Sequence, residues 1–473
     1  MKTGPVRQCI STLISSEYHG ARPYGALTVI VSLAIVACND TSAPSGPRIT
    51  EVNIVDHGPL LRTAMVELDA VAPVLIRYGA SAATELAVTS SQPLVRHEVL
   101  LPRLTADTHY TFEVASGTST VTGTFDTGSL PSDLASVVFE AEGEPSHPLT
   151  LLEFARQDGG DAFKGVVIVD GEGTVVWYFR AERAVTGTTR RANDNFVFLD
   201  LDRGLLEVTP AGDVVRTLPQ EPAGRTMHHD VIASPAGTLL VLRLDRQSTN
   251  DTLVAGEAIW EWNPETGSET KIWSSFDVMS PSTDRGPRYR HDDWLHANSL
   301  FLGTSGNILV SLHHLNQVIS IAPDRQSLEW RLGGTNATIA APSGEPFSGQ
   351  HTAAETGPDR VIVFDNGLER SEAYSRALEM SVHQQQATKL WEFRPPHDNW
   401  SRAISAARRL DNGNTLVTFG MGPGVGGSTG PIEVYDVDAG GGIAWHLKVQ
   451  GNVQLMYRAT ALSHIGGEQP VAR

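Results

Sequence analysis

Three segments of this sequence share one layout, in which a histidine stands just before a short apolar strand. The segments are HHDVIASPAGTLLVL, LHANSLFLGTSGNILVSL and GQHTAAETGPDRVIVFDNG, which begin at His228, Leu295 and Gly349. A neutral imidazole can act as a nucleophile, as a general acid or base, or as a metal ligand. One such histidine would most simply cap a strand end. Three at equivalent positions, with Asn298 and Gln350 beside them, predict a shared site.

The elements that must position these histidines repeat along the chain from about residue 135. Each unit contains an opening strand, a glycine turn, an apolar strand, a polar connection and a strand rich in Trp or Val, over about forty to fifty residues. Six such units predict a six-bladed β-propeller across residues 135–470. Because the first strand of each blade lines the central channel, histidines of consecutive blades converge there. The final stretch VQLMYRATAL is expected to close the ring against the first blade and so protect the strand edges.

The composition agrees with an all-β protein. The chain has 473 residues with 44 Gly and 27 Pro, which suits a turn-rich fold. Its formal net charge of -18 argues against nucleic acid as a partner. Residues 48–128 alternate short strands and turns, as expected of a β-sandwich similar to fibronectin type III. Within LLPRLTADTHYTFEV, Leu104 is predicted to be core and Tyr110 to be the corner tyrosine of such a sandwich.

Residues 1–37 have the features of an export signal. The apolar run YGALTVIVSLAIVAC follows Arg22 and is too short for a membrane span. Its end, Ile-Val-Ala-Cys, resembles a bacterial lipobox, which implies cleavage before Cys38 and lipid on its sulfur. Residues 38–47 would then be a flexible tether. We therefore expect an exported lipoprotein, periplasmic or at the cell surface, anchored to the membrane through Cys38.

Cysteine usage excludes two kinds of site. The chain has two cysteines, Cys9 and Cys38. Cleavage would remove the first and lipidate the second, so that the mature protein would contain neither a disulfide nor a free thiol. A cysteine nucleophile and a cysteine-based zinc site are therefore both excluded.

Several motifs, taken together, resemble the bacterial arylsulfate sulfotransferase family. In order along the chain they are HHD, DWLHANS, a histidine before NQVISI, W-x-LGG, GQH, FDNG, YSRALE, RLDNGNTLV and YRA. They cover roughly the last two-thirds of the chain. The resemblance implies an exported six-bladed propeller with a small N-terminal β domain, which moves a sulfuryl group from a phenolic sulfate ester to a phenol. It implies no nucleotide sulfate donor and no other cofactor, and this chain has no glycine-rich loop to cradle phosphate.

The resemblance also implies roles for individual residues. His351 in GQH corresponds to the family's nucleophile, which forms a sulfohistidine intermediate in a ping-pong reaction. His228 and His296 correspond to groups that stabilise charge in the transition state or protonate the leaving phenolate. The residues implied to bind substrate are His229, Asn298, Gln350 and Tyr457.

The chain departs from the family at one position. Where family members carry an arginine that clamps the sulfate, this sequence reads SLHH from residue 311. Arginine offers a permanent charge and a planar fork of donors, and histidine offers neither reliably at neutral pH. The residues that could replace the clamp are His313, Arg331, Arg402 and Arg458.

Two other functions stay open. One is a metal-dependent enzyme, in which zinc or another divalent ion is held by His228, His229, His296 and His351. No pair of these histidines has the spacing of a rigid local chelate, which argues against it. The other is a non-catalytic lipoprotein whose propeller binds a partner or ligand. The pair Arg408-Arg409 is predicted to be a solvated strand face.

Overall fold

The computed structural model describes residues 31–32, 46–83, 85–155, 163–221, 226–249, 251–451 and 453–466. The predicted lipidation site Cys38, and most of the predicted signal peptide and tether, lie outside the described residues. Strands make up most of the regular structure, so the all-β prediction is confirmed. Within the described ranges, no helix has both the length and the apolar character needed to cross a membrane.

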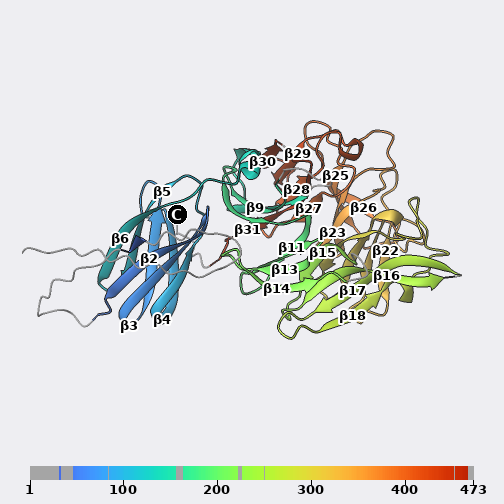
Figure 1. Ribbon diagram of the computed structural model, residues 1–473. Coiled ribbons are helices and arrows are strands. Elements are labelled where there is room, and N and C mark those ends of the chain that lie inside the picture. Colours follow the sequence, from blue (N-terminus) through green and yellow to red (C-terminus); the bar gives the residue numbers. More distant parts are fainter. Residues whose placement is uncertain are drawn as a thin grey trace, which may run out of the picture.

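The N-terminal part of the chain is a separate sheet assembly, drawn in blue in Figure 1. Its strands are β1 (Val31–Ser32), β2 (Ile49–Gly58), β3 (Leu61–Gly79), β4 (Leu86–Leu101), β5 (His109–Ser116) and β6 (Ser119–Asp126). The first half of β3 pairs with β2 and the end of β4, and its second half pairs with the start of β4 and with β5. Alternate side chains of these strands form one apolar core.

The predicted corner of this domain has the expected contacts. Leu104 is fully buried, and the Tyr110 hydroxyl accepts a hydrogen bond of 3.0 Å from the Thr105 backbone N–H. Such a bond from a corner tyrosine to nearby backbone is typical of β-sandwiches. Assignment to the fibronectin type III class stays a prediction.

After the short helix α1 (Ser132–Ala135), the rest of the chain forms six sheets arranged in a ring, coloured from green to red in Figure 1. The second to fifth sheets each contain four consecutive strands, counted from the channel outward. These strands are β11 (Val185–Arg190), β12 (Phe196–Asp200), β13 (Gly204–Val208), β14 (Val214–Pro219), β15 (Met227–Ala233), β16 (Leu239–Thr249), β17 (Thr252–Trp262), β18 (Glu269–Ser274), β19 (Ala297–Leu302), β20 (Ile308–Leu312), β21 (Gln317–Ile321), β22 (Leu328–Leu332), β23 (His351–Gly357), β24 (Arg360–Asp365), β25 (Arg376–Ser381) and β26 (Thr388–Phe393).

The first and sixth sheets close the ring. The sixth contains β27 (Ala406–Arg409), β28 (Thr415–Phe419), β29 (Ile432–Val437) and β30 (Ile443–Gln450), and β7 (Val138–Gly143) adds a fifth strand at its edge. The first contains β8 (Leu149–Ala155), β9 (Gly165–Asp170) and β10 (Val175–Arg180), and its inner strand is the last strand of the chain, β31 (Leu455–Leu462). The pairing of β31 with β8 confirms the predicted closure, whereas the pairing of β7 with β30 was not expected.

The inner strands β11, β15, β19, β23, β27 and β31 neighbour one another around the axis. Register shifts interrupt most of them near their N-terminal ends, for example between Met227 and Val231 and between His351 and Ala353. Such bulges bend the strand and redirect its side chains. The backbone is left-handed at the same openings, with φ of 58° at His229, 52° at His296 and 50° at Thr352. This conformation is uncommon for residues other than glycine, and here it turns the histidines toward the axis.

Candidate functional site

The predicted histidines lie together: His228, His229, His296 and His351 stand at the N-terminal ends of inner strands, and His313 directly follows β20. Ring centroids are 5.0 Å apart for His228 and His229, 4.8 Å for His229 and His296, 5.2 Å for His296 and His313, and 5.1 Å for His313 and His351. We call these five residues, together with His314, the histidine layer. Residues from three blades, more than a hundred positions apart in sequence, therefore face one another as the repeat predicted.

His351 has both ring nitrogens engaged. Its Nδ1 lies 3.0 Å from Oδ1 of Asn366, and its Nε2 accepts a hydrogen bond of 3.1 Å from the Ile404 backbone N–H. The Asn366 amide nitrogen donates to the Ser401 carbonyl at 2.6 Å, so its Oδ1 must face the imidazole. The proton therefore sits on Nδ1, and Nε2 carries the free electron pair. Burial lowers the pKa of His351 to about 3, which keeps the ring neutral at neutral pH.

His296 is oriented by a carboxylate that the sequence did not single out. Its Nδ1 lies 2.7 Å from Oδ2 of Asp293, three residues earlier in DDWLH. Burial opposes ionisation of Asp293, but the hydrogen bond from His296 and the charges of nearby histidines hold its pKa below the usual range. A carboxylate on one imidazole nitrogen sets the tautomer, orients the ring and stabilises its charged form.

His314 packs on the other side of this pair. Its ring stacks on His296 with centroids 4.7 Å apart, and its Nδ1 donates to the Asp293 carbonyl at 2.8 Å. Ligand atoms of Asp293, His296 and His314 all lie within 4.8 Å of one another, which is close enough to share a divalent ion. The metal set expected from the sequence was different and included His351, whose two nitrogens have other partners.

His228 and His229 form a second pair at the start of β15. Their Nδ1 atoms are 2.8 Å apart, so one must donate and the other accept, and at least one ring is neutral. Burial and the neighbouring histidines lower the pKa of His229 well below its ordinary value. The Nε2 of His228 lies 2.9 Å from Oε2 of Glu257 but off the direction of a hydrogen bond. Glu257 also accepts from the Ala297 backbone N–H at 2.9 Å and so ties two blades together.

His313 occupies the place between His296 and His351. It is buried, and its Nδ1 has no hydrogen-bond partner within the described part of the chain. Burial and the charges of His351 and His296 lower its pKa well below the ordinary value. His313 therefore stands where it can donate to a bound group, but as a neutral imidazole and without the permanent charge of an arginine.

Two arginines predicted to replace the clamp do not reach the histidine layer. Arg331 lies on β22, the outermost strand of its sheet, where its guanidinium donates to Asp284 at 2.6 Å and to Gln317 at 3.1 Å. Arg402 is exposed and donates to the Gly426 carbonyl at 2.9 Å. The prediction for Arg331 is wrong, because its strand lies at the outer edge of the blade, and within the described residues Arg402 makes no hydrogen bond or ion pair with the histidine layer. Arg458 lies in the channel and is described below.

The remaining predicted residues are near the histidines but have structural partners. Asn298 was expected to bind substrate through its amide group. Instead it is buried, and its amide nitrogen donates to the Gln350 carbonyl at 2.8 Å. Gln350 is fully buried, and its amide donates to Ser311 and to two backbone carbonyls, which corrects its assignment as a substrate-binding residue. Tyr457 lies with its ring 6.3 Å from that of His229, and its hydroxyl donates to the Asn298 carbonyl at 3.1 Å, so its contact with substrate stays a prediction.

Comparisons with known proteins identify the family to which the chain belongs. No curated protein matches the chain. Solved structures include an inactive virginiamycin B lyase from Staphylococcus aureus with quinupristin, which is 10% identical, has a TM-score of 0.35, and covers 66% of this chain and 99% of its own. A quinonprotein alcohol dehydrogenase-like protein from Bacteroides thetaiotaomicron is 10% identical, with a TM-score of 0.37 and coverage of 85% and 95%. These similarities are too weak to carry an argument.

The family model described as Arylsulfotransferase (ASST) matches residues 148–458, which is well over half of the chain. The matched residues span the whole histidine layer, five of the six inner strands and the first half of β31. The chain therefore belongs to the arylsulfotransferase family, and it is a sulfotransferase enzyme.

Proposed function

We propose that this protein transfers a sulfuryl group from a phenolic sulfate ester to a phenol through a sulfohistidine on His351, without a nucleotide donor. The observation that carries the proposal is the state of His351. Its ring is buried and neutral, with the proton held on Nδ1 and the electron pair on Nε2. A neutral imidazole with a fixed tautomer is the form that can attack sulfur.

In the first step, Nε2 of His351 attacks the sulfur of the donor. The N–S bond forms as the ester S–O bond breaks, and the bonding electrons leave on the phenolate oxygen. The sulfated ring carries a positive charge, which the hydrogen bond from Nδ1–H to Asn366 stabilises. The low basicity of His351 also makes it a good leaving group for the second transfer.

The Ile404 backbone N–H has a further part in this step. It occupies the electron pair of Nε2 at 3.1 Å, so it must withdraw before attack. Ile404 and Ser405 have φ of 51° and 80°, which is a strained conformation for side chains of these types. A small relaxation of this segment would free Nε2 and leave the N–H beside an oxygen of the transferred group, where it can stabilise negative charge.

His296 is the proposed acid and base. Its Nδ1 is bound to Asp293, which leaves Nε2 to exchange a proton with the phenol oxygen. In the first step the protonated ring gives its proton to the leaving phenolate. In the second step the neutral ring takes the proton of the acceptor phenol, whose oxygen attacks the sulfur and releases His351. The donor phenolate and the acceptor phenol therefore exchange their protons with the same imidazole, one after the other.

Neutral donors take the place of the family's sulfate clamp in this proposal. His313 and His229 flank the two reacting histidines, and burial keeps both rings uncharged. Each can donate one N–H to a sulfate oxygen. Because neutral donors stabilise an oxyanion less than a guanidinium does, we expect weaker donor binding than an arginine clamp would provide.

The test is to mix the protein with an aryl sulfate and no acceptor, quench the reaction, and map the added sulfuryl mass on peptides above neutral pH. The expected result is label on His351 and loss of turnover by several orders of magnitude in His351→Asn. His383→Asn is the matched control, because that histidine is exposed and, among the described residues, pairs with Asp359 at the surface. Full turnover in His351→Asn, or label on another residue, would contradict the assignment.

One observation favours a second candidate, a metal-dependent transfer. Asp293, His296 and His314 offer two imidazoles and one carboxylate within reach of one ion. A metal there would take Asp293 and the His296 imidazole as ligands, so the hydrogen bond that orients His296 as acid and base would be lost. Activity that disappears on exhaustive chelation and returns with a divalent ion would favour this candidate. Undiminished activity after chelation, with no bound metal by elemental analysis, would exclude it.

A further inference from the structure

The axial channel contains a cavity on the side away from the histidine layer. Its volume is about 390 Å³, and it is lined by inner-strand residues that follow the histidines in sequence, including Ile232, Leu300 and Thr460. Two of its lining residues are direct neighbours of residues in or beside the histidine layer: Thr352 follows His351, and Arg458 follows Tyr457. The cavity therefore lies further along the inner strands than the histidine layer, which stands near their N-terminal ends.

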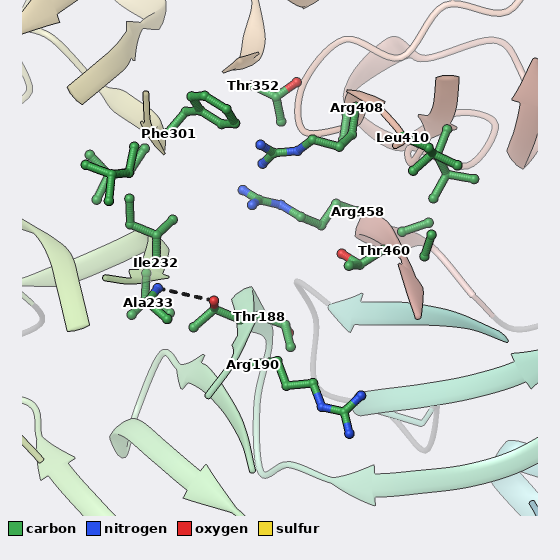
Figure 2. Close-up of a pocket in the computed structure, with 18 residues that line it drawn as sticks. Thr188, Arg190, Ile232, Ala233, Phe301, Thr352, Arg408, Leu410, Arg458 and Thr460 are labelled. Atoms are coloured by element: carbon green, nitrogen blue, oxygen red, sulfur yellow. Dashed lines mark hydrogen bonds between the residues drawn. The ribbon is translucent and has the colours of Figure 1, made fainter. Parts of the chain in front are cut away.

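Two arginines project into this cavity. In Figure 2 the side chains of Arg408 and Arg458 extend side by side toward Phe301 and Ile232, while Arg190 points away. The Arg408 guanidinium carbon lies 5.2 Å from the centroid of the Phe301 ring. The prediction of a solvated strand face at this position is wrong for Arg408, because β27 directs it inward. Its neighbour Arg409 does turn to the other side of the strand, where it pairs with Glu379 at 2.7 Å.

The charges of these arginines are only partly balanced by protein groups. Arg458 is 5% exposed and binds Asp230 at 3.0 Å, but its Nε and Nη2 atoms have no hydrogen-bond partner within the described ranges. The Arg408 guanidinium packs on Phe301 and makes no hydrogen bond or ion pair with any described residue. Burial and the charge of Arg458 lower the pKa of Arg408 to about 10, and burial raises the pKa of the nearby Glu153 to about 7. Among the described residues, Asp230 is the carboxylate that forms an ion pair with these two guanidinium groups, through Arg458.

The geometry points to a binding site in this cavity for an amphipathic oxyanion, a sulfate, sulfonate or carboxylate that carries an aromatic or aliphatic group. Two guanidinium groups with free N–H donors match the oxygens of such a head group. The rest of the lining suits an attached apolar body, since it consists largely of aliphatic side chains with Phe301 and a few threonine hydroxyls. A volume of about 390 Å³ lies within the range of small-molecule sites.

This site is separate from the proposed reaction centre and does not depend on it. The cavity lining includes none of the histidines of the layer. The cavity residues occupy a different level of the inner strands from the histidines, and Nε2 of His351 is directed to the Ile404 backbone and not to the cavity lining. The ligand is therefore held and not transferred, and the site exists whether or not the protein turns over aryl sulfates.

The test measures binding of benzenesulfonate by titration calorimetry. This probe has a sulfonate head on an aromatic ring, and its C–S bond cannot take part in sulfuryl transfer. The measurement uses a His296→Asn/His351→Asn background, which removes the proposed reaction centre. We expect one benzenesulfonate per chain, with binding weakened about tenfold or more by Arg408→Gln, as for loss of a charged hydrogen-bond partner. Arg409→Gln is the matched control and should leave the affinity unchanged.

Two further measurements make the outcome decisive. Arg408→Lys keeps the positive charge but lacks the planar set of guanidinium donors, so it should also weaken binding of benzenesulfonate. This variant replaces Arg408→Gln in the test if Arg408→Gln does not fold. Inorganic sulfate should bind more weakly than benzenesulfonate, because it does not contact the apolar lining. The inference is overturned if benzenesulfonate does not bind, if its affinity survives both Arg408 substitutions, or if inorganic sulfate binds as tightly.

Discussion

The Asp293→Asn substitution tests the acid–base role of His296 most directly. Asparagine is nearly the same size and still offers an oxygen to Nδ1 of His296, so the ring should keep its orientation. What is lost is the negative charge beside the imidazole. If His296 protonates the leaving phenolate, the variant should be slow with donors whose phenol is weakly acidic. It should be nearly normal with donors whose phenolate needs no proton.

The magnitude follows from the 2.7 Å contact between Asp293 and His296. At this distance two unit charges attract by about 6 kcal/mol at an effective dielectric constant of about 20, and by about 1.5 kcal/mol in water. The Asp293 side chain is 24% exposed and that of His296 is 30% exposed, so solvent screens the pair and the lower part of this range applies. A loss of about 2 kcal/mol corresponds to roughly a thirtyfold fall in kcat.

The assay compares kcat across a series of aryl sulfates whose phenols differ in acidity, with one saturating acceptor. Asp359→Asn is the matched control, since Asp359 forms a similar pair with His383 at 3.0 Å on the surface. The expected result is a steeper dependence on leaving-group acidity in Asp293→Asn and no change in Asp359→Asn. An equal loss for every donor would refute the reasoning, because it would mean that Asp293 supports the structure of the site and not proton transfer.

Two further predictions concern other parts of the chain. We propose that Cys38 carries a lipid anchor, and we expect Cys38→Ser to release the protein into soluble fractions or block its processing; unchanged membrane association and mass would rule the anchor out. Glu153 is fully buried, and burial raises its pKa to about 7. The folded state therefore holds a proton that the unfolded state has already released, so wild-type stability should fall as pH rises from about 4.5 to about 7. Glu153→Gln lacks this contribution, so the wild-type Tm should decline relative to the Tm of the variant over this pH window. A wild-type Tm that rises relative to that of the variant would contradict the raised pKa of Glu153.

Part of the site could be predicted because it depends on a local pattern. His228, His296 and His351 each precede an apolar run bounded by a glycine turn, and such runs form strands wherever they occur. Once the repeat is recognised, ring closure brings equivalent positions together. The same reasoning placed the last strand against β8. It did not find β7 as an added strand of the sixth blade, because nothing in the local sequence specifies which sheet edge it joins.

Side-chain direction on the inner strands could not be read from the sequence. Arg408 and Arg409 look alike as neighbours in a polar stretch, yet one enters the channel and the other pairs with Glu379. Bulges and left-handed residues near the strand openings decide which side chains face the axis, and they depend on packing between blades. Arg331 was misplaced for a related reason, since its distance from the axis depends on its position in the outermost strand.

The sequence by itself determined the fold class, the closed ring and the gathering of histidines, because apolar periodicity and turn residues act over short stretches of chain. Only the tertiary structure decided what each imidazole can do. The partners that fix His351 come from Asn366, 15 residues away, and from the backbone of Ile404, 53 residues away. Protonation and tautomer depend on burial and on the atoms that contact each nitrogen. Asn366 follows β24 of the same blade as His351, and Ile404 precedes β27 of the next blade, so both nitrogens find their partners only when the blade has folded and its neighbour has packed against it.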